Sequence, residues 1–220
     1  MKHTSSRDDV ARARSRREKL LNEARHELIL DAARSAFLQH GLAGTTLREI
    51  AKRAGYTPGA LYTYFSSQEE IYGALLADSL QKLTAAIEAA GAGVEGAPPD
   101  RGRTATCLRD QAMAFYFYYR DHPNELDLGL YLFNGTRPRG LTPELNRQLN
   151  DRLMEALAPI RRGLEALGLT AEESTLETAG IFSHVVGALV LRNTGRIRLF
   201  GVNADTLAQR YLDALLLRLG

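Results

Sequence analysis

The chain has 220 residues, of which 45% are hydrophobic and 25% charged, and this composition is typical of a globular protein. Its single cysteine, Cys107, excludes an internal disulfide and is consistent with a reducing cytoplasm. No run of eighteen uncharged apolar residues is present, and the N-terminus lacks the apolar stretch of a signal peptide. We therefore expect a cytoplasmic protein without a membrane span.

Positive charge is concentrated near the N-terminus. Residues 1–68 carry 12 Lys/Arg and 7 Asp/Glu, a balance of +5, whereas residues 69–220 carry 16 and 19, a balance of −3. The densest basic run extends from Arg12 to Lys19. Charge of one sign at one end indicates a polyanionic partner there, although a solvated, disordered tail has the same composition.

Helical periodicity dominates the chain, and no run of alternating β-branched residues predicts a strand. The first clear helix has an apolar face at Leu28 or Ile29, Ala32, Ala33, Ala36 and Phe37, and Gly41 supplies a left-handed residue to end it. A second helix begins at "TTLREIAKRAG", where Thr46 and Glu49 have the spacing of a capping box. We expect it to end at Gly55.

A third, short helix follows in "TPGALYTYF". Thr57 can cap it, and Pro58 suits its first position. Two helices joined by a short turn with glycine form a helix-turn-helix, whose second helix enters the DNA major groove. Leu61 and Phe65 would anchor this helix, and the tyrosine hydroxyls beside them can donate to phosphate. A helix hairpin that only packs is the alternative.

Longer helical segments fill the rest of the chain. A fourth helix begins after the capping-box pair Ser67 and Glu70 and runs toward Ala90, and a loop rich in Gly and Pro covers residues 91–103. The later helices are expected at 104–120, 124–134, 143–167, 171–194 and 204–218. We expect Pro159 to kink or break the third of these.

Aromatic residues are concentrated in residues 113–135, and such side chains either line an apolar ligand pocket or fill a core. His184 could add a polar group to a pocket or serve as a structural hydrogen-bonding residue. The last two helices are apolar on several sides, so they require cover from a second copy or from their own chain.

Residues 29–76, which include "TTLREIAKRAG" and "LYTYF" before an acidic helix start, resemble the DNA-binding region of TetR/AcrR family transcriptional regulators. The resemblance implies an all-helical homodimer with three N-terminal DNA-binding helices and a C-terminal domain for a small molecule. It implies that Tyr62 contacts phosphate. Gln68 departs from the family, which usually has a phosphate-binding Lys there. The predicted DNA-binding residues are Arg16, Arg17, Thr46, Arg48, Thr57, Pro58, Gly59, Tyr62, Thr63, Tyr64 and Gln68.

We predict an all-α protein with a flexible basic arm (1–16), a helix-turn-helix domain (17–67) and a helical ligand-binding and dimerisation domain (68–220). The predicted ligand-binding residues are Met113, Phe117, Tyr118, Tyr131, Phe133 and His184. The predicted dimer interface comprises Gly187, Leu191, Leu207, Tyr211 and Leu215. The predicted function is a repressor that binds palindromic operator DNA and is released by a small apolar effector.

The sequence contains no Gly-rich phosphate loop, HExxH, GxSxG or cysteine cluster, so we predict no enzymatic activity, cofactor or metal. A small helical-bundle enzyme and a non-specific architectural DNA-binding protein remain as alternatives.

Overall fold

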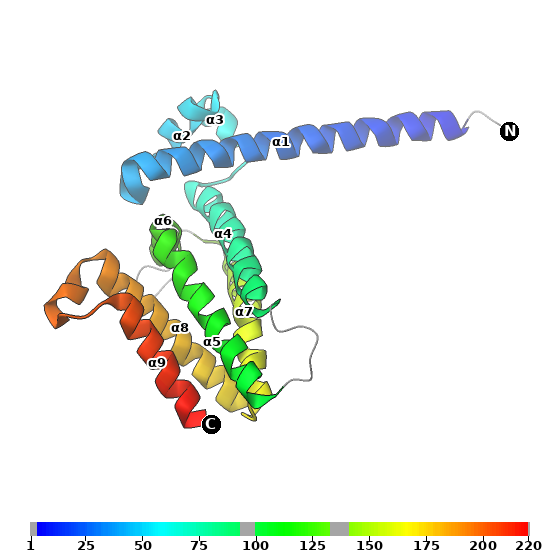
Figure 1. Cartoon of the computed structure of the whole chain (residues 1–220). Coiled ribbons are helices and arrows are strands. Elements are labelled where there is room, and N and C mark those ends of the chain that lie inside the picture. The colour runs from blue at the N-terminus through cyan, green and yellow to red at the C-terminus, as the bar shows by residue number, and fades with distance from the viewer. Residues whose placement is uncertain (1–3, 93–99, 133–140, 220) are drawn as a thin grey trace. The chain divides into compact units, whose positions relative to one another are not determined.

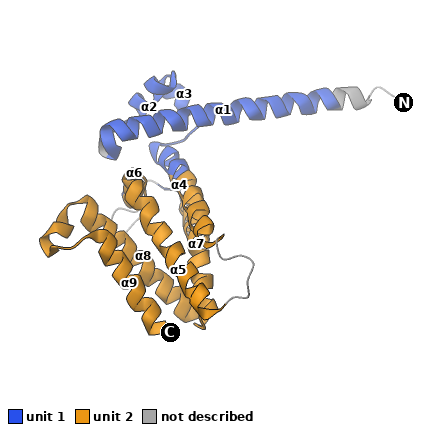
Figure 2. Ribbon diagram, in the orientation of Figure 1, with its two compact units in different colours: residues 1–75, 131–141 blue, residues 76–130, 142–220 orange. Residues whose placement is uncertain are grey.

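The computed structural model describes residues 4–92, 100–132 and 141–219, and within these ranges every regular element is a helix. The prediction of an all-α fold is confirmed. The chain divides into two compact units, one formed by residues 1–75 and 131–141 and the other by residues 76–130 and 142–220 (Figure 2). We call them unit 1 and unit 2.

Unit 1 contains α1 (Thr4–Gly44), α2 (Leu47–Ala54), α3 (Pro58–Leu61) and the first turns of α4 (Gln68–Gly91). The second half of α1 buries the predicted apolar face from Ile29 to Phe37, whereas its first half extends past α2 and α3 (Figure 1). Gly41 has φ 66°, as expected for a residue that interrupts the helix, and helical turns resume as far as Gly44. The expected flexibility of residues 1–16 stays a prediction, and the described part of this segment forms the start of α1.

The predicted caps of the two short helices are present. The Thr46 hydroxyl accepts a hydrogen bond from the backbone N–H of Glu49 at 3.2 Å, and Gly55 ends α2 in the left-handed region at φ 74°. Thr57 accepts from the N–H of Ala60, also at 3.2 Å. Glu49 does not complete the capping box, because its carboxylate binds Arg53 instead.

Unit 2 contains the rest of α4, α5 (Arg101–Asp121), most of α6 (Pro123–Leu132), α7 (Pro143–Ala166), α8 (Ala171–Asn193), the 3₁₀ helix η2 (Arg196–Phe200) and α9 (Ala204–Leu219). Of the two effects expected of Pro159, the break does not occur, because α7 continues through Pro159 to Ala166. Pro159 lacks the backbone N–H that would donate to the preceding turn of α7. Its side chain is buried in the packing of unit 2.

By length and composition alone, helix α8 is long and apolar enough to cross a membrane. The core helix of a globular protein has the same length and composition. Its residues Ile181, Val185, Ala188 and Leu189 are buried in unit 2, whereas buried residues make up 33% of its most apolar stretch.

Candidate nucleic-acid interface and ligand groove

The short helix α3 separates its anchoring side chains from its exposed ones. Leu61 is 0% exposed and Phe65 is 4% exposed, whereas Tyr62 between them is 58% exposed. The N-terminal residues of α3, Thr57 to Gly59, are also exposed. A side chain placed at Gly59 would meet no atom within 4 Å. The arrangement leaves a small, open helix tip and one phenolic hydroxyl available to a partner, which are features expected of a major-groove helix.

Tyr64 is more enclosed than its neighbour Tyr62. Its half-buried ring lies 5.6 Å from that of His26 in a T-shaped contact and 5.8 Å from that of Tyr56. Aromatic pairs at these separations stabilise packing beyond the area that they bury. Sequence reasoning missed His26 and Tyr56, which carry no motif and lie outside α3. Tyr64 therefore connects α3 to α1 in addition to its predicted role at DNA.

Thr63 follows Tyr62 on the exposed side, and its hydroxyl donates to the carbonyl of Ala60 at 2.7 Å. The oxygen of this hydroxyl keeps a free lone pair, so in this geometry it can accept but has no second proton to donate. Thr46 and Arg48 are exposed on the neighbouring helix α2.

Arg53 holds α2 against α1. Its guanidinium donates to Glu49 at 2.7 Å and to Ser35 at 3.0 Å, and it also contacts Gln39 and His40. The hydrogen bond from Arg53 lowers the pKa of the Glu49 carboxyl from its usual value of 4.5. No sequence pattern indicated this role, since Arg53 lies in a basic turn that also suits DNA contact.

Gln68 does not point its amide N–H groups outward. Its Nε2 donates to the carbonyl of Thr45 at 3.0 Å and to the hydroxyl of Tyr72 at 2.8 Å. Two donors are all that a glutamine amide has. Tyr72 is fully buried, and burial raises the pKa of its hydroxyl. The prediction that Gln68 donates to phosphate therefore needs correction: in this structure its donors fix the start of α4 to the turn before α2.

The predicted effector residues are not brought together. Met113 is buried, and Phe117 lies beneath the guanidinium of Arg120, 4.4 Å from the ring centre. The Tyr118 hydroxyl donates to Glu125 at 2.5 Å and lies 3.2 Å from the carbonyl of Ser79; burial and Glu125 raise its pKa. These three aromatic-segment residues belong to the packing of unit 2.

The remaining predicted effector residues lie elsewhere. Tyr131 belongs to unit 1, where its ring contacts that of Tyr72 at 5.7 Å, and Phe133 falls outside the described residues. His184 lies on α8, stacked 4.1 Å from the ring of Tyr211. The described residues among the predicted effector set therefore do not form a single aromatic cavity.

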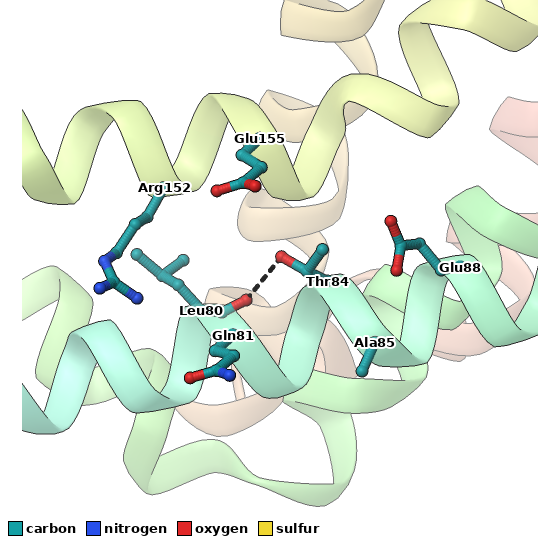
Figure 3. Close-up of a pocket in the computed structure, with 7 residues that line it drawn as sticks. All are labelled: Leu80, Gln81, Thr84, Ala85, Glu88, Arg152 and Glu155. Carbon is teal, nitrogen blue, oxygen red and sulfur yellow. Dashed lines mark hydrogen bonds between the residues drawn. The ribbon is translucent and has the colours of Figure 1, made fainter.

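A groove of about 580 Å³ lies between α4 and α7 in unit 2. Figure 3 shows Arg152 and Glu155 of α7 pointing toward α4, and Thr84 and Glu88 of α4 pointing toward α7. The Thr84 hydroxyl donates to the carbonyl of Leu80 at 2.9 Å, so it can only accept from a ligand. Among the described residues, no hydrogen bond or ion pair crosses this groove between its lining side chains. The sequence did not predict this groove, because its charged residues lie on two helices that are distant in the sequence.

The predicted dimer residues divide into exposed and buried positions. Gly187 is exposed on α8, while Leu191, Leu207 and Tyr211 are half-buried. Leu215 is 2% exposed within the single chain, so its prediction as an interface residue is corrected to one of the core of unit 2. The reason is helical phase: α9 turns Ala204, Ala208, Leu212 and Leu215 inward.

His184 lies beside this face. It lines a cavity of about 280 Å³ with Val202, Thr206, Leu207, Arg210 and Tyr211. Two of these six residues, Leu207 and Tyr211, are predicted dimer residues. The structure therefore groups His184 with the predicted interface instead of with the aromatic segment.

Exposed short helices with buried anchors, joined through α4 to a helical unit, define the class of DNA-binding helix-turn-helix proteins. Comparison with known proteins is more specific. Residues 29–75 match the family model described as bacterial regulatory proteins, tetR family. These residues include α2, α3 and the buried half of α1.

Two curated relatives each match one short stretch of the chain. The transcriptional regulator TtgR of Pseudomonas putida is 48% identical over 54 residues, covering 24% of this chain and 25% of TtgR. The transcriptional repressor KstR2 of Mycobacterium tuberculosis is 43% identical over 65 residues, covering 30% of this chain and 32% of KstR2. The chain thus matches between a quarter and a third of each relative's length.

Solved structures extend the similarity over the whole fold. The regulatory protein SCO4313 covers 90% of this chain and 98% of its own length, with a TM-score of 0.66 and 24% identity. The regulator FadR of Bacillus subtilis, solved with stearoyl-CoA, covers 86% and 97%, with a TM-score of 0.58 and 18% identity. The match over residues 29–75 and the relatives' short alignments show a tetR-type segment in this chain, and the solved structures show that the whole chain shares their fold.

Proposed function

We propose that this protein is a cytoplasmic, ligand-responsive transcriptional repressor that binds a palindromic operator as a homodimer. The observation that carries the proposal is α3, whose exposed tip from Thr57 to Gly59 and exposed Tyr62 stand on the buried anchors Leu61 and Phe65. Repression is favoured by KstR2, a repressor that is 43% identical to this chain over 65 residues.

Two-fold symmetry follows from how such a helix reads DNA. Two copies of α3 can occupy successive major grooves only when they lie about 34–36 Å apart, or a multiple of this distance. The partly exposed residues of α8 and α9, with the cavity beside His184, are the surface that we propose for an isologous dimer. A dimer with this symmetry requires a palindromic site.

The effector is proposed to be a small molecule with an apolar body and a polar end. The groove between α4 and α7 supports both parts, because Leu80 and Ala85 line it together with the charged side chains of Glu88, Arg152 and Glu155. The ligand of FadR, stearoyl-CoA, also combines an acyl chain with a polar group. Such a ligand acts only if it binds the DNA-competent and DNA-free states unequally, because equal affinities shift no population.

The DNA-binding proposal is tested by selecting bound duplexes from a random pool with the purified full-length chain. We expect the selected sequences to converge on a palindrome and the protein to bind it as a dimer. Retention of random sequences with no enrichment would favour the alternative of a non-specific architectural protein.

The effector proposal is tested by calorimetric titration of bound compounds with and without the selected operator. Linkage requires that the operator weaken effector binding by the same factor by which the effector weakens operator binding, typically about 1–3 kcal/mol of coupling. Equal affinities with and without operator for every bound compound would contradict effector control. Turnover of a bound compound without DNA binding would favour the helical-bundle enzyme.

A further inference from the structure

The first half of α1 is a helix without a packing partner in the described part of the chain. All 17 residues from Asp9 to Arg25 are exposed. At about 1.5 Å per residue, this segment projects roughly 25 Å from the packed part of its helix. We call residues 9–25 the helical arm.

Ion pairs divide the cations of the helical arm into two groups. Arg14 donates to Glu18 at 3.1 Å, and Lys19 lies 3.8 Å from Glu23, so a carboxylate accompanies each of these cations. Arg12, Arg16, Arg17 and Arg25 have no ion pair among the described residues, and the first three of these lie close together in the sequence. The two groups alternate along the same short stretch of sequence.

The first three of these arginines share adjacent sides of the helix. Arg12 and Arg16 are four residues apart and lie on one face, and Arg17 lies about 100° further round. Arginine donors suit phosphate oxygens, and an unpaired arginine brings no carboxylate that would repel a polyanion. A paired cation contributes less, because its glutamate stays beside it.

We propose that the helical arm is a second DNA-contact surface, separate from α2 and α3, which binds the phosphate backbone through Arg12, Arg16 and Arg17. The inference rests on the proposed function, and it specifies that a helix, not a flexible tail, presents these side chains. The contact is independent of base sequence, because phosphate contacts position a protein without reading bases. It extends the footprint beyond the bases that α3 reads.

The composition of the helical arm favours DNA over a lipid surface. Its large exposed apolar residues are Val10, Leu20 and Leu21, and three such side chains do not form the broad apolar face of a membrane-surface helix. The paired glutamates also alternate with the cations, which weakens a general attraction to an anionic membrane. Binding to anionic lipid vesicles as tight as to duplex DNA would overturn the proposal.

Two variants of equal charge test the assignment. Arg16→Gln with Arg17→Gln removes two unpaired cations, and Arg14→Gln with Lys19→Gln removes two paired ones from the same helix. The probe is a random-sequence duplex of about four helical turns. We expect the first variant to lower the salt slope of binding by about 0.9 for each phosphate that an arm no longer neutralises, and the second to change it much less. Equal reductions in the two variants would show that only net charge matters and would overturn the assignment.

A third variant, Leu20→Pro, keeps every charge and interrupts the helix at an exposed position between the arginines and the packed half of α1. We expect it to lose a large part of the salt slope that the Arg16 and Arg17 variant loses, with reduced helicity by circular dichroism. Unchanged binding with reduced helicity would show that a flexible arm suffices and would overturn the helical presentation. Because the probe is random DNA, these outcomes stand apart from the operator selection, which tests the proposed repressor.

Discussion

Unit 1 and helix α5 of unit 2 use their aromatic residues differently. In unit 1, Leu61 and Phe65 are buried while Tyr62 is exposed, so anchoring and contact belong to different side chains. In unit 2, Tyr116 is buried yet donates to Asp205 at 2.6 Å, and Tyr118 is hydrogen-bonded between helices. The comparison teaches that a tyrosine is available to bind a partner only where the fold leaves its side chain exposed, as it does at Tyr62.

The largest expected effect separates core from interface on α9. Leu215→Glu places a carboxylate in the core of unit 2, so we expect a loss of more than about 4 kcal/mol of unfolding free energy. Leu207→Glu, at a half-buried position on the same helix, should keep the fold and weaken the dimer. Thermal melts and analytical ultracentrifugation measure both. A folded, dimeric Leu215→Glu protein would refute the burial of that residue.

The next effect concerns the contact between α1 and α2. Arg53→Met removes the donors to Glu49 and Ser35, so we expect a lower melting temperature at neutral pH. The pKa of Glu49 is lowered in the folded state, so its ion pair stabilises the fold above the usual value of 4.5. This contribution is lost as the pH falls through the folded-state pKa.

Melting temperatures at a series of pH values check this prediction. Arg53→Met should reduce the acid sensitivity in that range, whereas Arg48→Met, at an exposed position of α2, should leave it unchanged. The same acid sensitivity in the Arg53 variant and the parent protein would contradict the role of this ion pair.

A smaller effect distinguishes a positioning residue from a phosphate ligand. Gln68→Ala removes the hydrogen bonds to the Thr45 carbonyl and the Tyr72 hydroxyl, so we expect a loss of about 1 kcal/mol of stability. The salt slope of DNA binding should not change, because a neutral amide releases no counterion. Denaturant titration and salt-dependent binding measure the two quantities. Weaker DNA binding with unchanged stability would restore the phosphate role.

The smallest effect is expected at Tyr62. Tyr62→Phe removes one exposed hydroxyl and keeps the ring, so stability should be unchanged. Binding to operator and to random DNA should weaken by similar factors, about 1 kcal/mol, since a phosphate contact carries no base information. Fluorescence anisotropy with both duplexes measures this. A change in base preference at constant affinity would assign Tyr62 to base readout instead.

The same contrast explains what the sequence could predict. The caps at Thr46 and Thr57 depend on residues three apart, and the anchors of α3 depend on one helical turn, so these features were predictable from local spacing. The inward position of Gln68 depends on Thr45, 23 residues earlier, and that of Tyr116 depends on Asp205, 89 residues later. Periodicity contains no information about such partners.

The groove between α4 and α7 shows a second limit. Thr84 and Glu155 face each other only because two helices distant in sequence lie side by side in unit 2. The burial of Leu215 shows a third, since several leucines of α9 fit either stripe of an apolar helix. The hydrophobic pattern identifies a helix with apolar faces that must be buried. Which face packs against which partner depends on the tertiary structure.

The central claim is that the open tip of α3 meets DNA, and Gly59 tests it most directly. Gly59 has ordinary backbone geometry, and no atom lies within 4 Å of a side chain placed there. Gly59→Leu should therefore leave the melting temperature unchanged and block approach to the major groove. The measurement is anisotropy of a duplex selected by the unmodified protein. We predict a loss of at least about a hundredfold in affinity, roughly 2.7 kcal/mol, in a fully folded protein. Undiminished binding by the folded variant would contradict the claim.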